Sequence, residues 1–148
     1  MEIKKAEKEE LKRLIPVYKE FFPVHAIFTR SDEEVLDYLE NLKGDILIAV
    51  EDNSVVGGLV IARKKYGHTV ANFKHIAAKD GDKETIKELV KKAEELSDAA
   101  KIELNIADGE KIPYSFFEGL GYETEGKLKS HYRQGETCYI LGKTKKEE

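Results

Sequence analysis

The stretch 45–78 constrains the fold most, because it contains three strand-like segments in immediate succession. These are DILIAVE at 45–51, SVVGGLVIARKK at 54–65 and HTVANFKHIAA at 68–78. Their β-branched and apolar residues favour strands. Asp52-Asn53 is a hairpin signal, and KYG at 65–67 supplies a second turn. Gly57-Gly58 predicts a bulge in the middle segment. The stretch therefore predicts three hairpin-joined strands.

Four further segments have helical spacing of apolar residues. EELKRLIPVYKEFF at 9–22 contains Pro16, which we expect to kink or split the helix. In SDEEVLDYLENLKG at 31–44, Ser31 and Glu34 form a capping-box pattern, and Gly44 is the expected end. A third helix follows AAKDGD at 77–82, and PYSFFEGLG at 113–121 predicts a short fourth helix that ends at Gly121.

The remaining segments complete the order of elements. A short strand is expected near Ile3, and KIELNIA at 101–107 alternates as a half-buried strand does. Two closing strands are expected at 122–133 and 136–143, and the charged tail from Gly142 is expected to fray. The order β-α-α-β-β-β-α-β-α-β-β predicts an α/β fold with a mixed, mostly antiparallel sheet of about seven strands and helices on both faces. Nothing resembles a linker, so we expect a single domain over 1–148.

Composition excludes several classes of function. The net charge of −4 argues against non-specific nucleic-acid binding, which needs a basic surface. The single cysteine excludes an internal disulfide, and the histidines and acids lack metal-ligand spacing, so we expect no metal. The chain has no long apolar run and no signal-peptide pattern at MEIKKAEKEE, so we expect a cytoplasmic protein without a membrane contact. The lysine- and glutamate-rich composition resembles that of heat-adapted proteins.

The C-terminal segment IELNIADGEKIPYSFFEGLGYETEGKLKSHYRQGETCYILGK carries a family resemblance. Together with the order of elements, it resembles the GNAT-type N-acetyltransferases over nearly the whole chain. Phe117, Gly121 and Tyr122 match that family's aromatic-x-x-x-Gly-aromatic phrase. The resemblance implies the GNAT-type acyl-CoA N-acyltransferase fold, with acetyl-CoA as co-substrate and an amine, on a small molecule or a peptide, as acceptor.

The resemblance also implies where the coenzyme lies: in a V-shaped gap between the strands at 68–78 and 101–107. Backbone at the end of the first strand polarises the thioester, and the next helix start holds the pyrophosphate. The implied coenzyme contacts are Ile76, Ala77, Ala78, Lys79, Gly81, Lys83, Thr85, Asn105 and Phe117.

The family's phosphate phrase, Arg/Gln-x-x-Gly-x-Gly/Ala, is not matched. An ungapped fit puts Gly81, Glu84 and Ile86 at its three marked positions. Glu84 would place a carboxylate beside the pyrophosphate, and Ile86 would crowd it. Two interpretations stay open: lysines near the helix start replace the lost arginine as point charges, or Asp80 or Asp82 caps the helix and the glycine only makes the turn.

Two residues are candidates for proton transfer. His75, near the end of its strand, is a candidate general base with the ordinary histidine pKa near 6.5, or a histidine without a catalytic role. The family often places a tyrosine acid on the late short helix, but Phe117 occupies the aligned position here. Tyr114, three residues earlier on the same helical face, is the fallback acid.

Two segments are candidates for contact with the acceptor. FFPVHAIFTR at 21–30 is apolar for a loop, and the resemblance places His25, Phe28 and Arg30 over the acceptor cleft. His131 and Tyr132 lie in the closing hairpin, which lines the same side in the family. Alternatively, the loop packs on the sheet or on a partner chain, and both segments are compatible with a homodimer.

Two functions remain at this point. The first is transfer of an acetyl or other acyl group from coenzyme A to an amine. The alternative is a GNAT-fold module that binds or regulates without turnover, which the unmatched phosphate phrase and the missing tyrosine favour.

Overall fold

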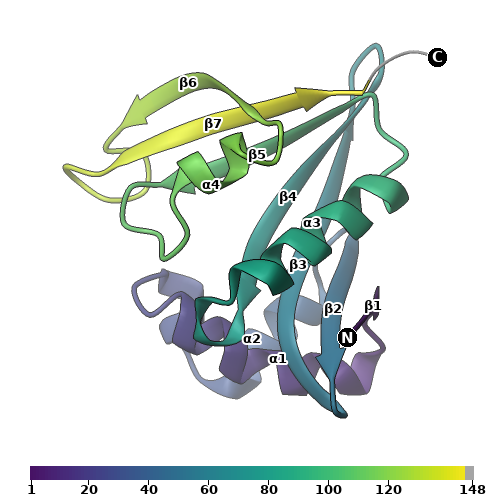
Figure 1. Cartoon of the computed structure of the whole chain (residues 1–148). Coiled ribbons are helices and arrows are strands. Elements are labelled where there is room, and N and C mark those ends of the chain that lie inside the picture. Colours follow the sequence, from purple (N-terminus) through teal and green to yellow (C-terminus); the bar gives the residue numbers. More distant parts are fainter. Residues whose placement is uncertain (146–148) are drawn as a thin grey trace.

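The computed structural model describes residues 1–145, and residues 146–148, the end of the charged tail, lie outside that description. One seven-stranded sheet has the order β1-β2-β3-β4-β5-β7-β6 (Figure 1). Its strands are β1 (Glu2–Lys5), β2 (Asp45–Glu51), β3 (Ser54–Lys65), β4 (Thr69–Ala78), β5 (Lys101–Ala107), β6 (Glu123–Lys129) and β7 (Thr137–Thr144). The helices are α1 (Lys8–Phe21), α2 (Asp32–Glu40), α3 (Lys83–Leu96) and α4 (Tyr114–Glu118), with short 3-10 turns η1 (Ala26–Thr29) and η2 (Lys79–Gly81). The predicted order of elements is confirmed.

The β2-β3-β4 meander forms as the sequence predicts. Asp52 and Asn53 both have positive φ, 50° and 65°, as a tight I′-type hairpin requires. The predicted bulge is confirmed in part, because register shifts lie on both sides of Gly57-Gly58. On the β4 side, two residues of β4, His75 and Ile76, face the single residue Leu59 of β3. The extra residue therefore belongs to β4, and it bends this strand at His75 and Ile76.

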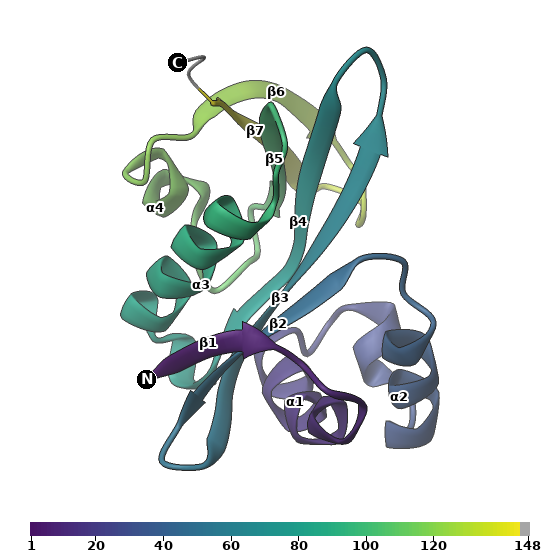
Figure 2. The same ribbon diagram turned by 90° about the vertical axis from the view of Figure 1, so that its right-hand side faces the viewer.

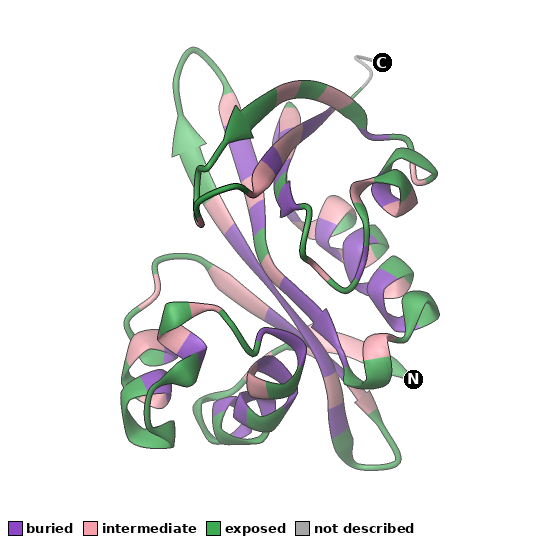
Figure 3. Cartoon of the chain, turned by 90° about the vertical axis from the view of Figure 1, so that its left-hand side faces the viewer, coloured by how far each residue is buried: buried purple, intermediate pink, exposed green. Residues whose placement is uncertain are grey.

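The helices cover both faces of the sheet. α1 and α2 lie on one face and α3 and α4 on the other (Figure 2). Buried residues gather where the strands run between these layers, and the β3-β4 hairpin tip is exposed (Figure 3). The apolar stripe predicted for α3 is buried at Ile86, Leu89, Val90 and Ala93. α1 is not split: Pro16 lies inside one continuous helix, on its exposed side.

Three expected ends of elements are wrong, and the first is that of the strand expected at 122–133, which forms as β6 but ends at Lys129. α2 begins with Ser31, whose hydroxyl accepts a hydrogen bond from the backbone N–H of Glu34, but it ends at Glu40 rather than at Gly44. Gly44 has φ +132°, and a Cβ at this position would collide with the carbonyl oxygen of Ile61 in β3. The glycine therefore allows the chain to pass close to β3 where it enters β2. The expected fraying is wrong for Gly142 to Thr144, which belong to β7. Near the end of α4, Gly121 has φ +100°, as a helix-terminating glycine does.

The junction of β4 and β5 creates the gap on which the site depends. These strands pair in parallel only from Val70 to Phe73 and from Lys101 to Leu104. Beyond that point they diverge, and β5 continues beside β7 while β4 continues beside β3 (Figure 1). Residues 74–78 of β4 therefore have no strand partner on their β5 side within the described chain. No helix in residues 1–145 is long and apolar enough to span a bilayer.

Candidate active site

A cavity of about 680 Å³ lies along the gap between β4 and β5. Its walls come from the end of α1, the η1 segment, β3, β4, β5 and the loop that follows β5. Rings and histidines line one part, including Phe22, His25 and His75, and polar side chains line another, including Asn105 and Tyr132. A cavity of this size that combines apolar rings with a few polar groups is typical of a small-molecule site.

His75 is held in a strained backbone conformation at the β4 bulge. Its φ is +50°, a left-handed value that is uncommon outside glycine, although asparagine, aspartate and histidine adopt it more often than other residues do. Its Nε2 forms a 2.7 Å hydrogen bond with the hydroxyl of Tyr38 in α2. Edge-on rings of Tyr18, Phe22 and Phe28 surround the imidazole at centroid distances of 5.9, 6.3 and 5.2 Å. Such strain persists only where the surroundings hold it, and it is a frequent mark of functional sites.

This enclosure determines the charge of His75. Burial, followed by the nearby charges of His25 and Lys74, lowers the pKa of His75 from its usual 6.5 to about 4. The expectation of an ordinary histidine pKa near 6.5 is therefore wrong. His75 is a neutral imidazole at neutral pH, and its hydrogen bond with Tyr38 aligns it.

A second polar pair joins two walls of the cavity. His25, at the start of η1, is bonded through Nε2 to Oε1 of Glu110 at 3.0 Å, across 85 positions of sequence. Both side chains are mostly buried, with exposed fractions of 24% and 14%. The ring of His25 lies 4.4 Å from the ring of Phe22, centroid to centroid. The adjacent Lys111 donates to the carbonyl of Glu20 at 2.8 Å, so the β5-α4 loop is attached twice to the α1 end.

The start of α3 is open by comparison. η2 turns the chain through two successive left-handed residues, Asp80 (φ 56°) and Gly81 (φ 63°). Asp82 occupies the N-cap position, but its carboxylate accepts from the hydroxyl of Thr85 at 2.7 Å rather than from a backbone N–H. The first N–H groups of α3 thus have no side-chain cap. Ile86 is fully buried in the core, so the expectation that it crowds this corner is wrong.

The lysines expected at this corner are exposed. Lys79, Lys83 and Lys87 take part in none of the ion pairs formed within residues 1–145. The exposed carboxylates of Asp80 and Glu84 lie on the same segment. A helix N-terminus with uncapped N–H groups favours an anion, and the mixed side chains around it add little net charge.

The structure brings only part of the predicted set to the cavity. Of the predicted residues, those that line the cavity are His25, His75, Ile76, Asn105, Phe117 and Tyr132. Phe28 is buried beneath it, against His75. The residues that do not line it are Ala77, Ala78, Lys79, Gly81, Lys83 and Thr85 at the α3 end, together with Arg30, Tyr114 and His131. Ala77 and Ala78 pair with Gly58 and Gly57 of β3.

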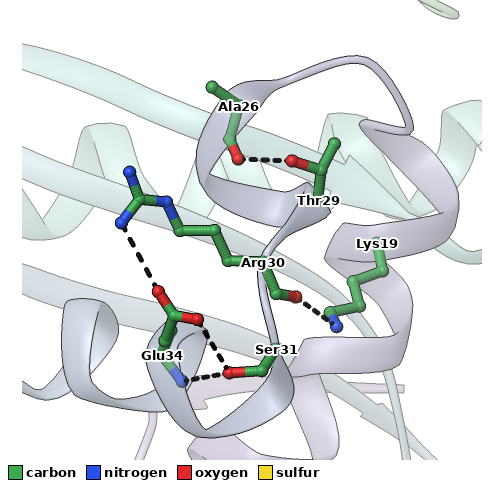
Figure 4. Close-up of polar contacts among 6 residues, drawn as sticks. All are labelled: Lys19, Ala26, Thr29, Arg30, Ser31 and Glu34. Atoms are coloured by element: carbon green, nitrogen blue, oxygen red, sulfur yellow. Dashed lines mark hydrogen bonds and ion pairs between the residues drawn. The ribbon is translucent and has the colours of Figure 1, made fainter.

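Two of the outlying residues have other partners. Arg30 points toward the start of α2, where its guanidinium lies 3.5 Å from Glu34 and its carbonyl accepts from Lys19 at 2.7 Å (Figure 4). Tyr114 stacks on Tyr139 of β7 with ring centroids 4.0 Å apart. Neither contact brings the side chain to the cavity wall.

Among the cavity residues that sequence reasoning missed, Tyr38 and Glu110 are the two that form hydrogen bonds with the histidines. Tyr38 lies beside the predicted apolar stripe of the second helix, three positions after Val35, and that spacing could have pointed to it. Glu110 lies in the loop sequence ADGEKIP, which has no periodicity. Its role depends on a contact with the distant His25, and nothing local signals it.

Comparison with known proteins identifies the fold. No protein-family model matches the chain, and no curated protein does either. Among solved structures, the chain is similar to the aminoglycoside 6'-N-acetyltransferase of Enterococcus faecium, with a TM-score of 0.82, 18% identity and 100% coverage of both chains. An aminoglycoside 6'-N-acetyltransferase complexed with coenzyme A gives a TM-score of 0.81 at 17% identity, again over 100% of both chains. A GNAT-family acetyltransferase from Streptococcus pneumoniae gives 0.72 at 14% identity, over 97% of this chain and 98% of that one. The chain therefore has the GNAT-type acetyltransferase fold.

Proposed function

We propose that this protein, which has the GNAT-type fold, transfers an acetyl or other acyl group from coenzyme A to an amine. The observation that carries the proposal is the divergence of β4 and β5 beside a cavity of about 680 Å³. It leaves the β5-facing backbone of residues 74–78 free to pair with an extended ligand. One structural neighbour was solved with coenzyme A, which contains such an extended arm.

The residues present fit the coenzyme through backbone groups. The uncapped first turn of α3 would face the pyrophosphate, with Lys79 and Lys83 as point charges. The bulge at His75 and Ile76 would direct a backbone N–H toward the thioester oxygen. Acetyl-coenzyme A supplies an activated acyl group and a good leaving group. Direct attack by the amine then needs no side-chain nucleophile.

The remaining predicted contacts divide between the two ligands in this proposal. Asn105 and Phe117, on the β5 side of the cavity, would contact the coenzyme. His25, at the α1 end of the cavity, and Tyr132, whose hydroxyl lies 3.4 Å from the side-chain nitrogen of Asn105, would contact the acceptor. His75 would align the bulge through Tyr38. Its low pKa does not favour the role of base, and the stacking of Tyr114 on Tyr139 does not favour the role of acid.

A thermal-shift titration with coenzyme A and acetyl-coenzyme A tests the proposal. A ligand that binds only the native state raises the unfolding midpoint with concentration. We expect a rising midpoint, reduced by the double variant Lys79→Glu/Lys83→Glu. The matched control is Lys12→Glu/Lys91→Glu, which reverses two exposed lysines, one in α1 and one in the middle of α3. No shift at millimolar ligand would contradict the proposal. A shift without acyl transfer to any amine would support the non-catalytic binding module instead.

A further inference from the structure

We propose that His25 is the proton acceptor for the attacking amine and that Glu110 positions it. This inference rests on the proposed acyl transfer. It assigns a catalytic role to a histidine on the η1 segment and a supporting role to a loop carboxylate 85 positions away.

The first argument is the orientation of the pair. Glu110 is an acceptor when ionised, so the 3.0 Å contact requires Nε2 of His25 to carry the proton. This fixes the tautomer in which Nδ1 holds the lone pair. Within the described chain, no hydrogen bond occupies Nδ1 of His25. A histidine whose one nitrogen donates to a carboxylate and whose other nitrogen is free has the arrangement of a general base.

The second argument is location. His25 and Glu110 both line the cavity that reaches Ile76 and the gap. The rings of His25 and His75 pack on the same Phe22 and Phe28. A base on this wall therefore lines the same cavity as the bulge that would hold the thioester. The ring contacts and the bond to Glu110 leave the imidazole little freedom, which is the preorganisation that proton transfer needs.

The third argument compares the two histidines. Nε2 of His75 is engaged with Tyr38, and three aromatic rings enclose its imidazole. The pKa of His75, lowered to about 4 by burial first and then by the charge of His25, keeps it neutral and a poor proton acceptor at neutral pH. Two histidines in one site with different environments divide into different roles. His75 holds the bulge, and His25 takes the proton.

The proton balance is simple. An alkyl ammonium acceptor loses one proton to Nδ1 of His25, and its nitrogen lone pair forms the new C–N bond with the thioester carbonyl carbon. The C–S bond breaks, and the thiolate takes the second proton that leaves the nitrogen. His25 then releases its proton to water, so that amide, free thiol and one solvent proton result.

Two nucleophiles of different basicity test the role. We would measure thiol release from acetyl-coenzyme A with n-butylamine, which is an ammonium at neutral pH, and with hydroxylamine, which is already neutral. In His25→Gln, we expect the rate with n-butylamine to fall about 100-fold and the rate with hydroxylamine to change less than about 5-fold. Glu110→Gln keeps an acceptor for Nε2, so we expect a smaller loss of about 10-fold with n-butylamine. His68→Gln, an exposed histidine outside the cavity, is the matched control.

A structural role gives a different result. If His25 and Glu110 only fasten the β5-α4 loop to the α1 end, both nucleophiles lose rate equally, and the proposal is overturned. Added imidazole should restore the n-butylamine rate of His25→Ala at least several-fold, and no restoration in a folded variant counts against it. Wild-type protein that binds acetyl-coenzyme A but releases no thiol with either nucleophile also overturns the role of His25 while leaving coenzyme binding intact. Absence of coenzyme binding overturns the proposed function itself.

Discussion

The two ends of the site differ in how their side chains are held. At the α1 end, the aromatic-histidine cluster (Tyr18, Phe22, His25, Phe28, Tyr38 and His75) is linked by ring contacts and closed by two hydrogen bonds of 2.7 and 3.0 Å. At the α3 start, the lysines are exposed and unpaired within the described chain, and a left-handed turn leads into an uncapped helix.

This difference corresponds to two kinds of chemistry. A fixed set of side chains can select an acceptor and move its proton, and both tasks depend on geometry within a fraction of an ångström. An anion at a helix start is held by backbone N–H groups that any sequence supplies. Side-chain identity therefore matters at the α1 end, and backbone shape matters at the α3 start. Side-chain substitutions should therefore change stability more at the α1 end than at the α3 start.

The largest effect is expected for Phe28→Ala. Phe28 is 2% exposed, and its ring packs on Tyr18 at 4.9 Å and on His75 at 5.2 Å. Its removal leaves a cavity at the centre of the cluster, and we expect a loss of about 3–4 kcal/mol in the free energy of unfolding. Urea denaturation measures this, with Phe28→Leu as the conservative variant and exposed Tyr66→Ala as the control. If Phe28→Ala and Tyr66→Ala lower the free energy of unfolding by the same amount, then packing around Phe28 does not stabilise the α1 end.

Two adjacent glycines of β3 allow a second comparison, because Gly57 faces α3 and Gly58 faces α1 on the other side of the sheet. A Cβ on Gly57 would meet the carbonyl oxygen of Ala77 and the methyl of Thr85, both at 2.9 Å, on the α3 side. A Cβ on Gly58 would meet the terminal methyl of Leu14 at 2.6 Å, on the α1 side. Backbone cannot retreat, whereas a leucine methyl can rotate away. We therefore expect Gly57→Ala to cost about 3 kcal/mol and Gly58→Ala about 1 kcal/mol.

The same denaturation series measures both glycine variants. A larger loss for Gly58→Ala would mean that Leu14 cannot shift, and that the packing on the α1 side is less adaptable than the backbone contact at Gly57. Coenzyme binding provides a second readout, since Gly57→Ala displaces the backbone at the end of β4 and Gly58→Ala does not.

Most of the fold was readable from sequence, for reasons that particular residues make clear. β2 and β3 have the predicted bounds because apolar alternation ends at turn residues such as Asp52 and Asn53, which accept positive φ. The end of α2 was misplaced because Gly44 is a strong helix stop in sequence. Its actual use is a close approach to Ile61, a tertiary contact that local patterns do not contain.

The sequence predicted only those site residues whose place follows from the order of the elements along the chain. His75 and Ile76 fall at the end of a predicted strand, so their place beside the gap followed from the order of elements. The pairing of His25 with Glu110 joins two loops without periodicity. The low pKa of His75 depends on burial among rings from α1, η1 and α2, which no local stretch of sequence describes.

The free energy of unfolding should also depend on pH through His75, which belongs to the cluster at the α1 end. The folded-state pKa of His75, about 4, is below the unfolded value of 6.5, so the unfolded chain binds more protons between these values. Its contribution to stability is therefore present above pH 6.5 and is lost as pH falls toward 4. We expect His75 to account for a loss of roughly 2 kcal/mol between pH 7 and pH 5. His75→Asn tolerates the positive φ and removes the titration, so its loss over this range should be smaller by that amount.

Exposed His68→Asn is the control for the titration, and guanidinium denaturation at the two pH values is the measurement. If His75→Asn and the wild type lose the same stability between pH 7 and pH 5, then His75 is not enclosed, and the α1 end resembles the α3 start in this respect.

The smallest effect is expected at the α3 start. Lys79 and Lys83 are exposed and have no ion pair within the described chain, so Lys79→Ala and Lys83→Ala should each change the free energy of unfolding by less than about 0.5 kcal/mol. Their effect should appear only with ligand, as a reduced rise of the unfolding midpoint in coenzyme A. A phosphate held by backbone N–H groups alone would leave that rise unchanged. In that case the backbone of the helix start, and not its lysines, would be the anion site. The two ends would then differ because side chains form the site at the α1 end and backbone groups alone form it at the α3 start.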